Sequence, residues 1–102
     1  MALSLNNQQI RALRAESHRL KLKPVVMIGH NGLSENVVNE LNQALDHHEL
    51  IKVRIPGMDK DDKVTFIDQV CQQTNAALIQ KIGHVIVLFR QNDDNKRFAK
   101  LL

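Results

Sequence analysis

The stretch PVVMIGHNGLS, residues Pro24–Ser34, decides the fold of this chain. Its first part, Pro24–Ile28, is an unbroken apolar run that predicts a strand covered on both faces. Its second part, the turn Gly29–Gly32, has a glycine at each end and leads into a helix that begins near Ser34. Glycine lets a ligand approach the main chain, and a helix start offers unpaired N–H groups and a positive dipole end. The turn therefore suits a phosphate group, although two glycines three residues apart also occur in ordinary tight turns.

Before this stretch, the sequence predicts an amphipathic helix. Asn6 is a suitable N-cap, and Gln9 three residues later closes a capping box. Leu5 and Ile10 complete a hydrophobic staple, and Pro24 is expected to end the helix. The inward face follows a 3-4-3 spacing and consists of Ile10, Leu13, Ser17 and Leu20. One position along, the same spacing gives a basic stripe of Arg11, Arg14, His18 and Lys21.

After the glycine turn, a second helix is expected to run to about His48. Ser34 is its predicted N-cap, Glu35 lies in its first turn, and Leu33 with Val38 forms a staple. Its inward residues are expected to be Val38, Leu41 and Leu45.

A clean alternation follows in Leu50–Ile55 and predicts a half-exposed strand that Pro56-Gly57 ends. Lys52 and Arg54 lie on its exposed face. The opposite face is formed by Ile51, Val53 and Ile55.

The last third of the chain predicts a helix and a hairpin. A turn at Met58–Asp62 leads into the helix, whose core side is expected to be Val64, Ile67, Val70, Cys71 and Thr74. Two strand-like runs, Ala77–Ile82 and Val85–Arg90, flank Gly83-His84 and predict an antiparallel hairpin. The polar tail 91–102 is expected to be flexible, with a short helical turn at 97–101.

The predicted element order is αβαβαββ, in one domain spanning residues 1–102. This order favours an α/β fold of the α+β two-layer kind, with a four-stranded mixed sheet packed by helices. Hydrophobic residues make up 43% of the chain and Trp and Tyr are absent, so the core must consist mainly of Leu, Ile, Val and Ala. No apolar run approaches the ~20 residues that cross a bilayer, and the first residues lack the pattern of a secretory signal. We therefore expect a cytoplasmic protein with no membrane partner.

Charge is distributed unevenly along the chain. The net charge is +3, yet the first 34 residues carry five Lys or Arg against one Glu, and the remaining 68 residues carry nine against ten acidic side chains. The positive field is therefore concentrated beside the glycine turn. This asymmetry favours a polyanionic partner.

The sequence does not indicate metal binding, an internal disulfide or catalysis. The five histidines lie on different predicted elements, and the aspartates at 59, 61 and 62 lack calcium-loop spacing, so no metal site is expected. The single Cys71 cannot form an internal disulfide, lies on an apolar stripe and is interpreted as a small core residue of a reducing compartment. No Ser, Cys or Thr has a recognisable base beside it. We expect neither an enzyme nor a cofactor nor a small-molecule substrate.

The glycine turn and the basic side chains together favour nucleic-acid binding. KH domains clamp a nucleic-acid backbone with a GxxG loop. Lys23 precedes the first predicted strand, and Lys52 and Arg54 project from another, so phosphate-pairing groups are expected to share a surface with the loop. The aromatic platform of RRM and OB folds is missing, which favours recognition of backbone and shape. Charged residues on a helix face are otherwise usually just solvated.

The chain resembles the CRM domain family, in particular the small single-domain bacterial YhbY type. The resemblance covers almost the whole chain and rests on four ordered blocks: His18–Val26, Ile28–Leu33, His48–Val53, and Ile82-Gly83 leading to Val87–Arg90. It implies a fold similar to the C-terminal domain of translation initiation factor three. It also implies RNA binding, and more narrowly association with ribosomal RNA of large-subunit precursors as a ribosome assembly factor.

Carried over by position, the resemblance assigns RNA contact to the loop and to neighbouring basic side chains. These are Gly29, His30, Asn31 and Gly32, with Arg11, Arg14, His18, Arg19, Lys21, Lys23, Lys52 and Arg54. The chain departs from the family pattern at two positions: His30 stands where a Lys is frequent, and Asn75 where a Gly is frequent. We expect a monomer; the alternative function is a protein–protein adaptor on ribosomal particles with incidental RNA contact.

Overall fold

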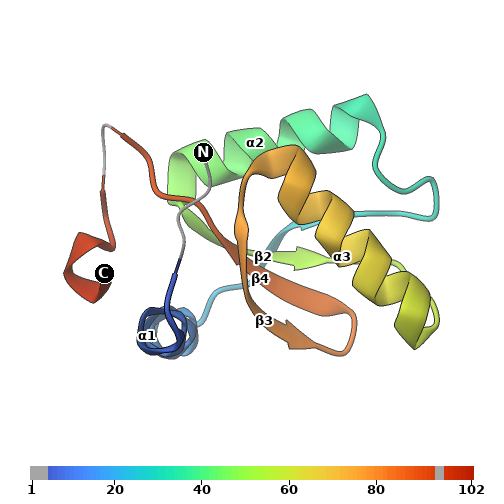
Figure 1. Cartoon of the computed structure of the whole chain (residues 1–102). Coiled ribbons are helices and arrows are strands. Elements are labelled where there is room, and N and C mark those ends of the chain that lie inside the picture. Colours follow the sequence, from blue (N-terminus) through green and yellow to red (C-terminus); the bar gives the residue numbers. More distant parts are fainter. Residues whose placement is uncertain (1–4, 94–95) are drawn as a thin grey trace.

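The computed structural model describes residues 5–93 and 96–102, in the predicted order of elements (Figure 1). The first four residues, which belong to the expectation about a secretory signal, lie outside this range, as do two residues of the tail. The elements are α1 (Asn7–Arg19), β1 (Pro24–Met27), α2 (Glu35–His48), β2 (Leu50–Arg54), α3 (Lys60–Thr74), β3 (Ala77–Ile82), β4 (Val85–Phe89) and a 3₁₀ turn, η1 (Ala99–Leu101).

The strands form one four-stranded mixed sheet in the order β1-β2-β4-β3. β1 runs parallel to β2, whereas β2 with β4 and β3 with β4 are antiparallel. The predicted hairpin is confirmed, and Gly83 at its turn has φ +55°, a conformation that glycine adopts without strain. The mixed sheet packed by helices is thus confirmed.

Helices lie on both faces of this sheet. α2 and α3 cover one face over the main core cluster, which consists of Val26, Ile28, Leu41, Leu45, Ile51, Val53, Ile55, Ile67, Val70, Ala76, Ile86 and Leu88. On the opposite face, α1 covers a smaller cluster of Leu13, Leu50, Ile79, Val87 and Phe89. α1, seen end-on in Figure 1, lies on the other side of the sheet from α2. The structure therefore adds a partial third layer to the expected two, because β2 and β4 are apolar on both faces at the end where α1 packs.

The predicted starts of α1 and α2 are confirmed, whereas α3 begins at Lys60, inside the stretch Met58–Asp62 that was predicted to be a turn. Asn6 and Gln9 form the capping box of α1, with Asn6 accepting from the Gln9 N–H at 2.8 Å. The Ser34 hydroxyl accepts from the Val37 N–H. Asp59 caps α3 by accepting from the Asp62 N–H at 2.9 Å, so helix capping accounts for this aspartate as expected.

The predicted end of α1 is wrong. The helix stops at Arg19, before Pro24, because Lys21 adopts a left-handed conformation with φ +53°. The N–H of Leu22 then donates to Ser17 O and that of Lys21 to His18 O, which closes a Schellman motif. Leu20, expected on the inward face, is consequently 42% exposed.

The prediction that the first strand is covered on both faces is also wrong. β1 is an edge strand, and only alternate residues point into the core, so Val26 is buried whereas Met27 is 70% exposed. In the helices, Val37 and Phe66 pack against the main cluster where Val38 and Val64 were expected to. Val37 and Phe66 each lie four residues before a buried residue, Leu41 and Val70 respectively, and so share its face of the helix.

The described part of the tail packs against the domain, which differs from the expectation of a flexible segment. Phe98, Leu101 and Leu102 extend the smaller apolar cluster beneath α1. Glu49, fully buried at the end of α2, accepts from the Arg97 N–H at 2.7 Å and from the Asn92 N–H. No local pattern in the sequence indicates this anchor, because it joins residues far apart in the chain.

Candidate nucleic-acid interface

The GxxG loop is a tight turn at the end of β1. The Gly32 N–H donates to Gly29 O at 3.0 Å, and Gly32 has φ +72°, which only glycine adopts readily. A Cβ on Gly29 would meet nothing within 4 Å, so this glycine leaves space open beside the main chain. His30 and Asn31 are exposed at the tip. The loop thus offers accessible main chain at the entrance to α2.

Lys52 and Arg54 lie next to β1 on the sheet. Lys52 is paired with Pro24 at the start of β1 and Arg54 with Met27 at its end, where Arg54 O accepts from the Ile28 N–H at 2.8 Å. Both side chains point to the face on which α1 packs, since Ile51 and Val53 between them point into the main cluster. Two strand positions apart, their Cα atoms are separated by about 7 Å, comparable to the phosphate spacing of an extended nucleic-acid strand.

Arg14 and His18 lie on one flank of α1, away from the C-terminal turn. Ala12, Glu16 and Arg19 form the other flank, which borders Leu101. Figure 1 shows the C-terminal turn on one side of α1 and the uncovered sheet on the other. Arg11 lies near this first flank and is exposed.

Arg19 differs from the other predicted site residues. Its guanidinium forms an ion pair with Glu16, and the hydrogen bond that Arg19 Nε donates to Glu16 Oε1, followed by the Glu16 charge, raises the pKa of Arg19. The positive charge of Arg19 is therefore partly compensated within the helix.

Lys21 and Lys23 connect α1 to β1. Lys23 and Lys52 line a groove of about 280 Å³ between the end of α1 and the start of the sheet. His48 and Arg97 line the same groove, and the sequence analysis did not select either of them. Nothing in the local sequence indicates this role for Arg97, because the packed tail brings it there.

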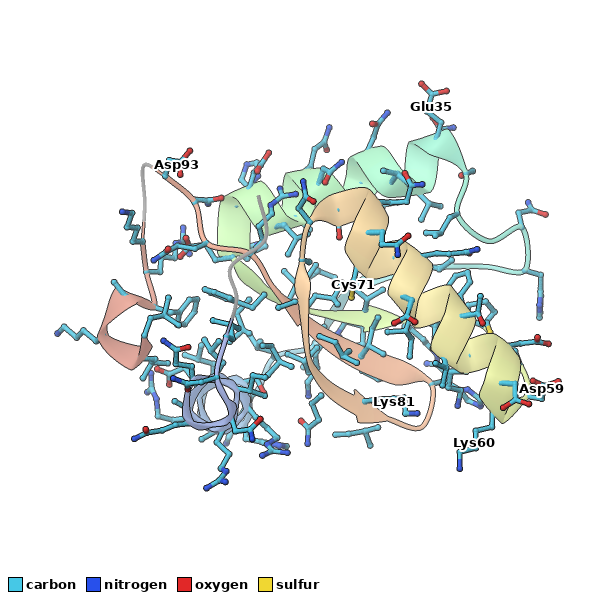
Figure 2. The ribbon with its side chains drawn as sticks, viewed as in Figure 1. Glu35, Asp59, Lys60, Cys71, Lys81 and Asp93 are labelled. Carbon is cyan, nitrogen blue, oxygen red and sulfur yellow. The ribbon has the colours of Figure 1, made fainter. Side chains whose placement is uncertain are left out.

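Acidic side chains gather on the opposite layer of the molecule. α2 carries Glu35, Glu40 and Asp46 and no Lys or Arg, and α3 carries Asp61, Asp62 and Asp68 against Lys60 and Lys63. Figure 2 shows Glu35 pointing outward from the start of α2, and Asp59 and Lys60 at the start of α3. The fold thus converts the uneven charge of the sequence into a basic side and a mainly acidic side.

The predicted site residues form a track rather than one compact patch. The loop lies beyond the end of β1, and α1 lies beyond its start, with Lys52 and Arg54 between them. The basic stripe is therefore separated from the loop by the length of a strand. The basic stripe and the loop were expected to lie side by side. They are instead connected along one surface by the neighbouring strands β1 and β2.

The described residues also bear on metal binding, cysteine reactivity and membrane-spanning helices. Within residues 5–93 and 96–102, no group of three His, Cys, Asp or Glu side chains is placed to hold a metal ion. Cys71 packs half-buried between α3 and the sheet (Figure 2), as predicted, and burial followed by the charge of Asp68 raises the pKa of its thiol to about 11. No helix in the described ranges is long and apolar enough to cross a membrane.

Comparison with known proteins gives a consistent result. Residues 5–90 match the model of the CRS1 / YhbY (CRM) domain. An RNA-binding protein of Haemophilus influenzae is 43% identical over 93 residues, covering 91% of this chain and 92% of that protein. A probable RNA-binding protein of Pseudomonas aeruginosa is 37% identical over 100 residues, covering 97% and 94%. The solution structure of a hypothetical Staphylococcus aureus protein, a candidate RNA-binding protein, superposes with a TM-score of 0.77 at 33% identity, covering 91% of this chain and 95% of that one.

These matches define a class of small α+β domains whose relatives are named for RNA binding and not for enzymatic activity. The chain belongs to the CRS1 / YhbY (CRM) domain family. The family resemblance and the non-enzymatic class expected from the sequence are thereby confirmed.

Proposed function

We propose that this protein binds ribosomal RNA of large-subunit precursors as a monomeric assembly factor in the cytoplasm. The observation that carries the proposal is the separation of charge across the sheet. The loop, Lys52, Arg54 and the flank of α1 form one basic side, and the acidic side chains of α2 and α3 lie on the other layer. A polyanion is attracted to the first side and repelled from the second.

Binding is to the RNA backbone. The loop presents main-chain N–H groups, and the basic track supplies side chains that pair with phosphates. The aromatic side chains Phe66, Phe89 and Phe98 all pack against the two core clusters, so none forms a base-stacking platform. Sequence selectivity on this surface comes from RNA shape.

Filter binding to purified large-subunit ribosomal RNA across a salt series tests the proposal. If about four to six phosphates are neutralised, affinity falls steeply with salt, and each basic residue removed lowers the logarithmic slope by roughly one. Lys52→Gln is expected to lower the slope, whereas its control Lys60→Gln, on α3, is not. Affinity that is independent of salt contradicts the mechanism.

The loop is tested separately with Gly32→Val. A β-branched residue at φ +72° costs about 2 kcal/mol of backbone strain, although a Cβ there would lie an ordinary 3.8 Å from Phe66 Cε1. We expect a folded protein with a distorted loop and weaker RNA binding. A folded variant with wild-type affinity removes the loop from the interface.

A protein–protein adaptor is the second candidate, and exposed apolar residues favour it. Val25 and Met27 of β1 lie uncovered on the basic side. Nuclease digestion of pre-ribosomal particles separates the two functions. Release of the protein supports RNA binding, and retention supports the adaptor.

A further inference from the structure

A second groove opens beside the GxxG loop, where three loops of the domain meet. It has a volume of about 420 Å³ and extends between the β1–α2 loop, the β2–α3 loop and the β3–β4 turn. Its polar lining side chains are Arg54, His30 and His84, and the rest of the lining is Met27, Ile28, Gly29, Ile55, Pro56 and Gly57. We call this the loop groove. No carboxylate is among its lining residues, so it is a cationic recess.

The backbone fixes His84 at this position. His84 O accepts from the Ile55 N–H at 2.8 Å, which ties the β3–β4 turn to the end of β2. The ring lies over Gly57, where a Cβ would be 3.7 Å from His84 Cε1 and 4.0 Å from Nε2. His84 is nevertheless an exposed residue. His84 is therefore held at the edge of the loop groove and stays accessible to a ligand.

We propose that Arg54, His30 and His84 form a phosphate-binding position in the loop groove, so that an RNA backbone held by the GxxG loop continues toward the β3–β4 turn. The proposal rests on the proposed RNA-binding function and adds His84 to the interface. A guanidinium binds phosphate oxygens through paired N–H donors, and a protonated imidazole donates from both ring nitrogens. An RNA strand that runs from the flank of α1 past Lys52 and Arg54 would reach the loop groove last.

The ammonium group of Lys63 adds a positive charge beside the loop groove. Lys63 of α3 donates from Nζ to Gly83 O at 3.1 Å, so this group lies beside the turn that carries His84. The first turn of α3 carries Lys60 together with Asp61 and Asp62, so it adds no net positive charge. The carboxylate of Asp59 caps α3 by accepting from the Asp62 N–H. Arg54 supplies the permanent charge of the groove, and the two histidine rings add N–H donors.

This position makes RNA affinity depend on pH. A histidine ring binds phosphate best in its protonated form, so the groove is expected to attract phosphate more strongly in acid solution. Because bound phosphate favours the protonated imidazole, affinity is expected to rise on the order of tenfold from pH 8 to pH 5.5. Replacement of His30 by Lys should give the higher affinity already at pH 8.

The experiment measures binding of purified large-subunit ribosomal RNA at pH 5.5 and pH 8 in a fixed buffer of constant ionic strength. The variants are His84→Gln and His30→Gln, singly and together. His47→Gln is the matched control, because His47 is an exposed histidine near the far end of α2 from the loop. His18→Gln measures the share contributed by α1. Circular dichroism confirms that each variant is folded.

We expect His84→Gln to remove a several-fold part of the pH dependence, the double variant to remove more, and the control to behave like the wild type. A His84→Gln protein with the wild-type pH profile overturns the proposal. If Gly32→Val and Lys52→Gln weaken binding while His84→Gln does not, the groove fails and the proposed function stands. If none of them weakens binding, the proposed function fails as well.

Discussion

Replacement of Glu49 by Gln should destabilise the domain strongly, although Glu49 lies on no catalytic or binding surface. Its side chain is 0% exposed, and its two carboxylate oxygens accept the main-chain N–H groups of Asn92 and Arg97. Its own N–H and C=O are also engaged, by Leu45 O and by the Arg90 N–H at 2.9 Å each. One residue therefore joins the end of α2 to the end of β4 and to the tail.

The magnitude follows from these contacts. A hydrogen bond to a charged group contributes about 1.5–3 kcal/mol. Glutamine keeps one acceptor oxygen but turns an NH₂ group toward the second main-chain donor, so one hydrogen bond is lost. We expect the free energy of unfolding to fall by about 2 kcal/mol as a result. For a domain of this size, that corresponds to a Tm lower by roughly 8–16 °C.

Urea unfolding and thermal denaturation measure the change, with Glu40→Gln as the matched control. Glu40 is an exposed residue of α2, so its replacement is expected to change stability by less than about 0.5 kcal/mol. If Glu49→Gln is as stable as the wild type within the same margin, the anchoring role of this carboxylate is refuted.

Three further outcomes are expected. Asn75→Gly should raise stability by about 0.5–1 kcal/mol in urea unfolding, because Asn75 has φ +55° and glycine adopts this conformation without strain. Arg90→Lys should cost about 2 kcal/mol, because Lys cannot reproduce the forked bonds of Arg90 to Asn42 and Thr74 O; unchanged stability would contradict this. Cys71, with its pKa raised to about 11, should react with iodoacetamide at pH 8 on the order of 100-fold more slowly than free cysteine, and faster as pH rises.

The turn and cap chemistry was predictable because it is local. Asn6 and Ser34 occupy their predicted caps, and Gly32 has the positive φ that glycine adopts readily in a tight turn. The end of α1 was not predictable in this way. Lys21 adopts a left-handed conformation with no glycine or asparagine to indicate it, and the apolar pattern continues past it to Leu22, which packs with the smaller cluster.

Several residues of the candidate interface could be predicted from the sequence, but their positions relative to one another could not. Lys52 and Arg54 were identified by alternation alone, because strand residues two apart share a face. His84 and Arg97 join the grooves only through the strand order and the packed tail, which no local pattern indicates. The pairing of Arg19 with Glu16, three residues apart on one helix, was open to prediction and was overlooked.

The sequence by itself determined the order of elements, the helix caps, the glycine loop and the excess of positive charge near the N-terminal end. These features depend on residues within a few positions of one another, where propensity, periodicity and side-chain chemistry act directly. The tertiary structure alone decided that β1 is an edge strand, that α1 covers the face opposite α2 and α3, and that acidic and basic groups lie on different layers. Those outcomes depend on which apolar faces bury one another across long stretches of chain, and this long-range packing draws the loop, the basic track and His84 toward one side of the sheet.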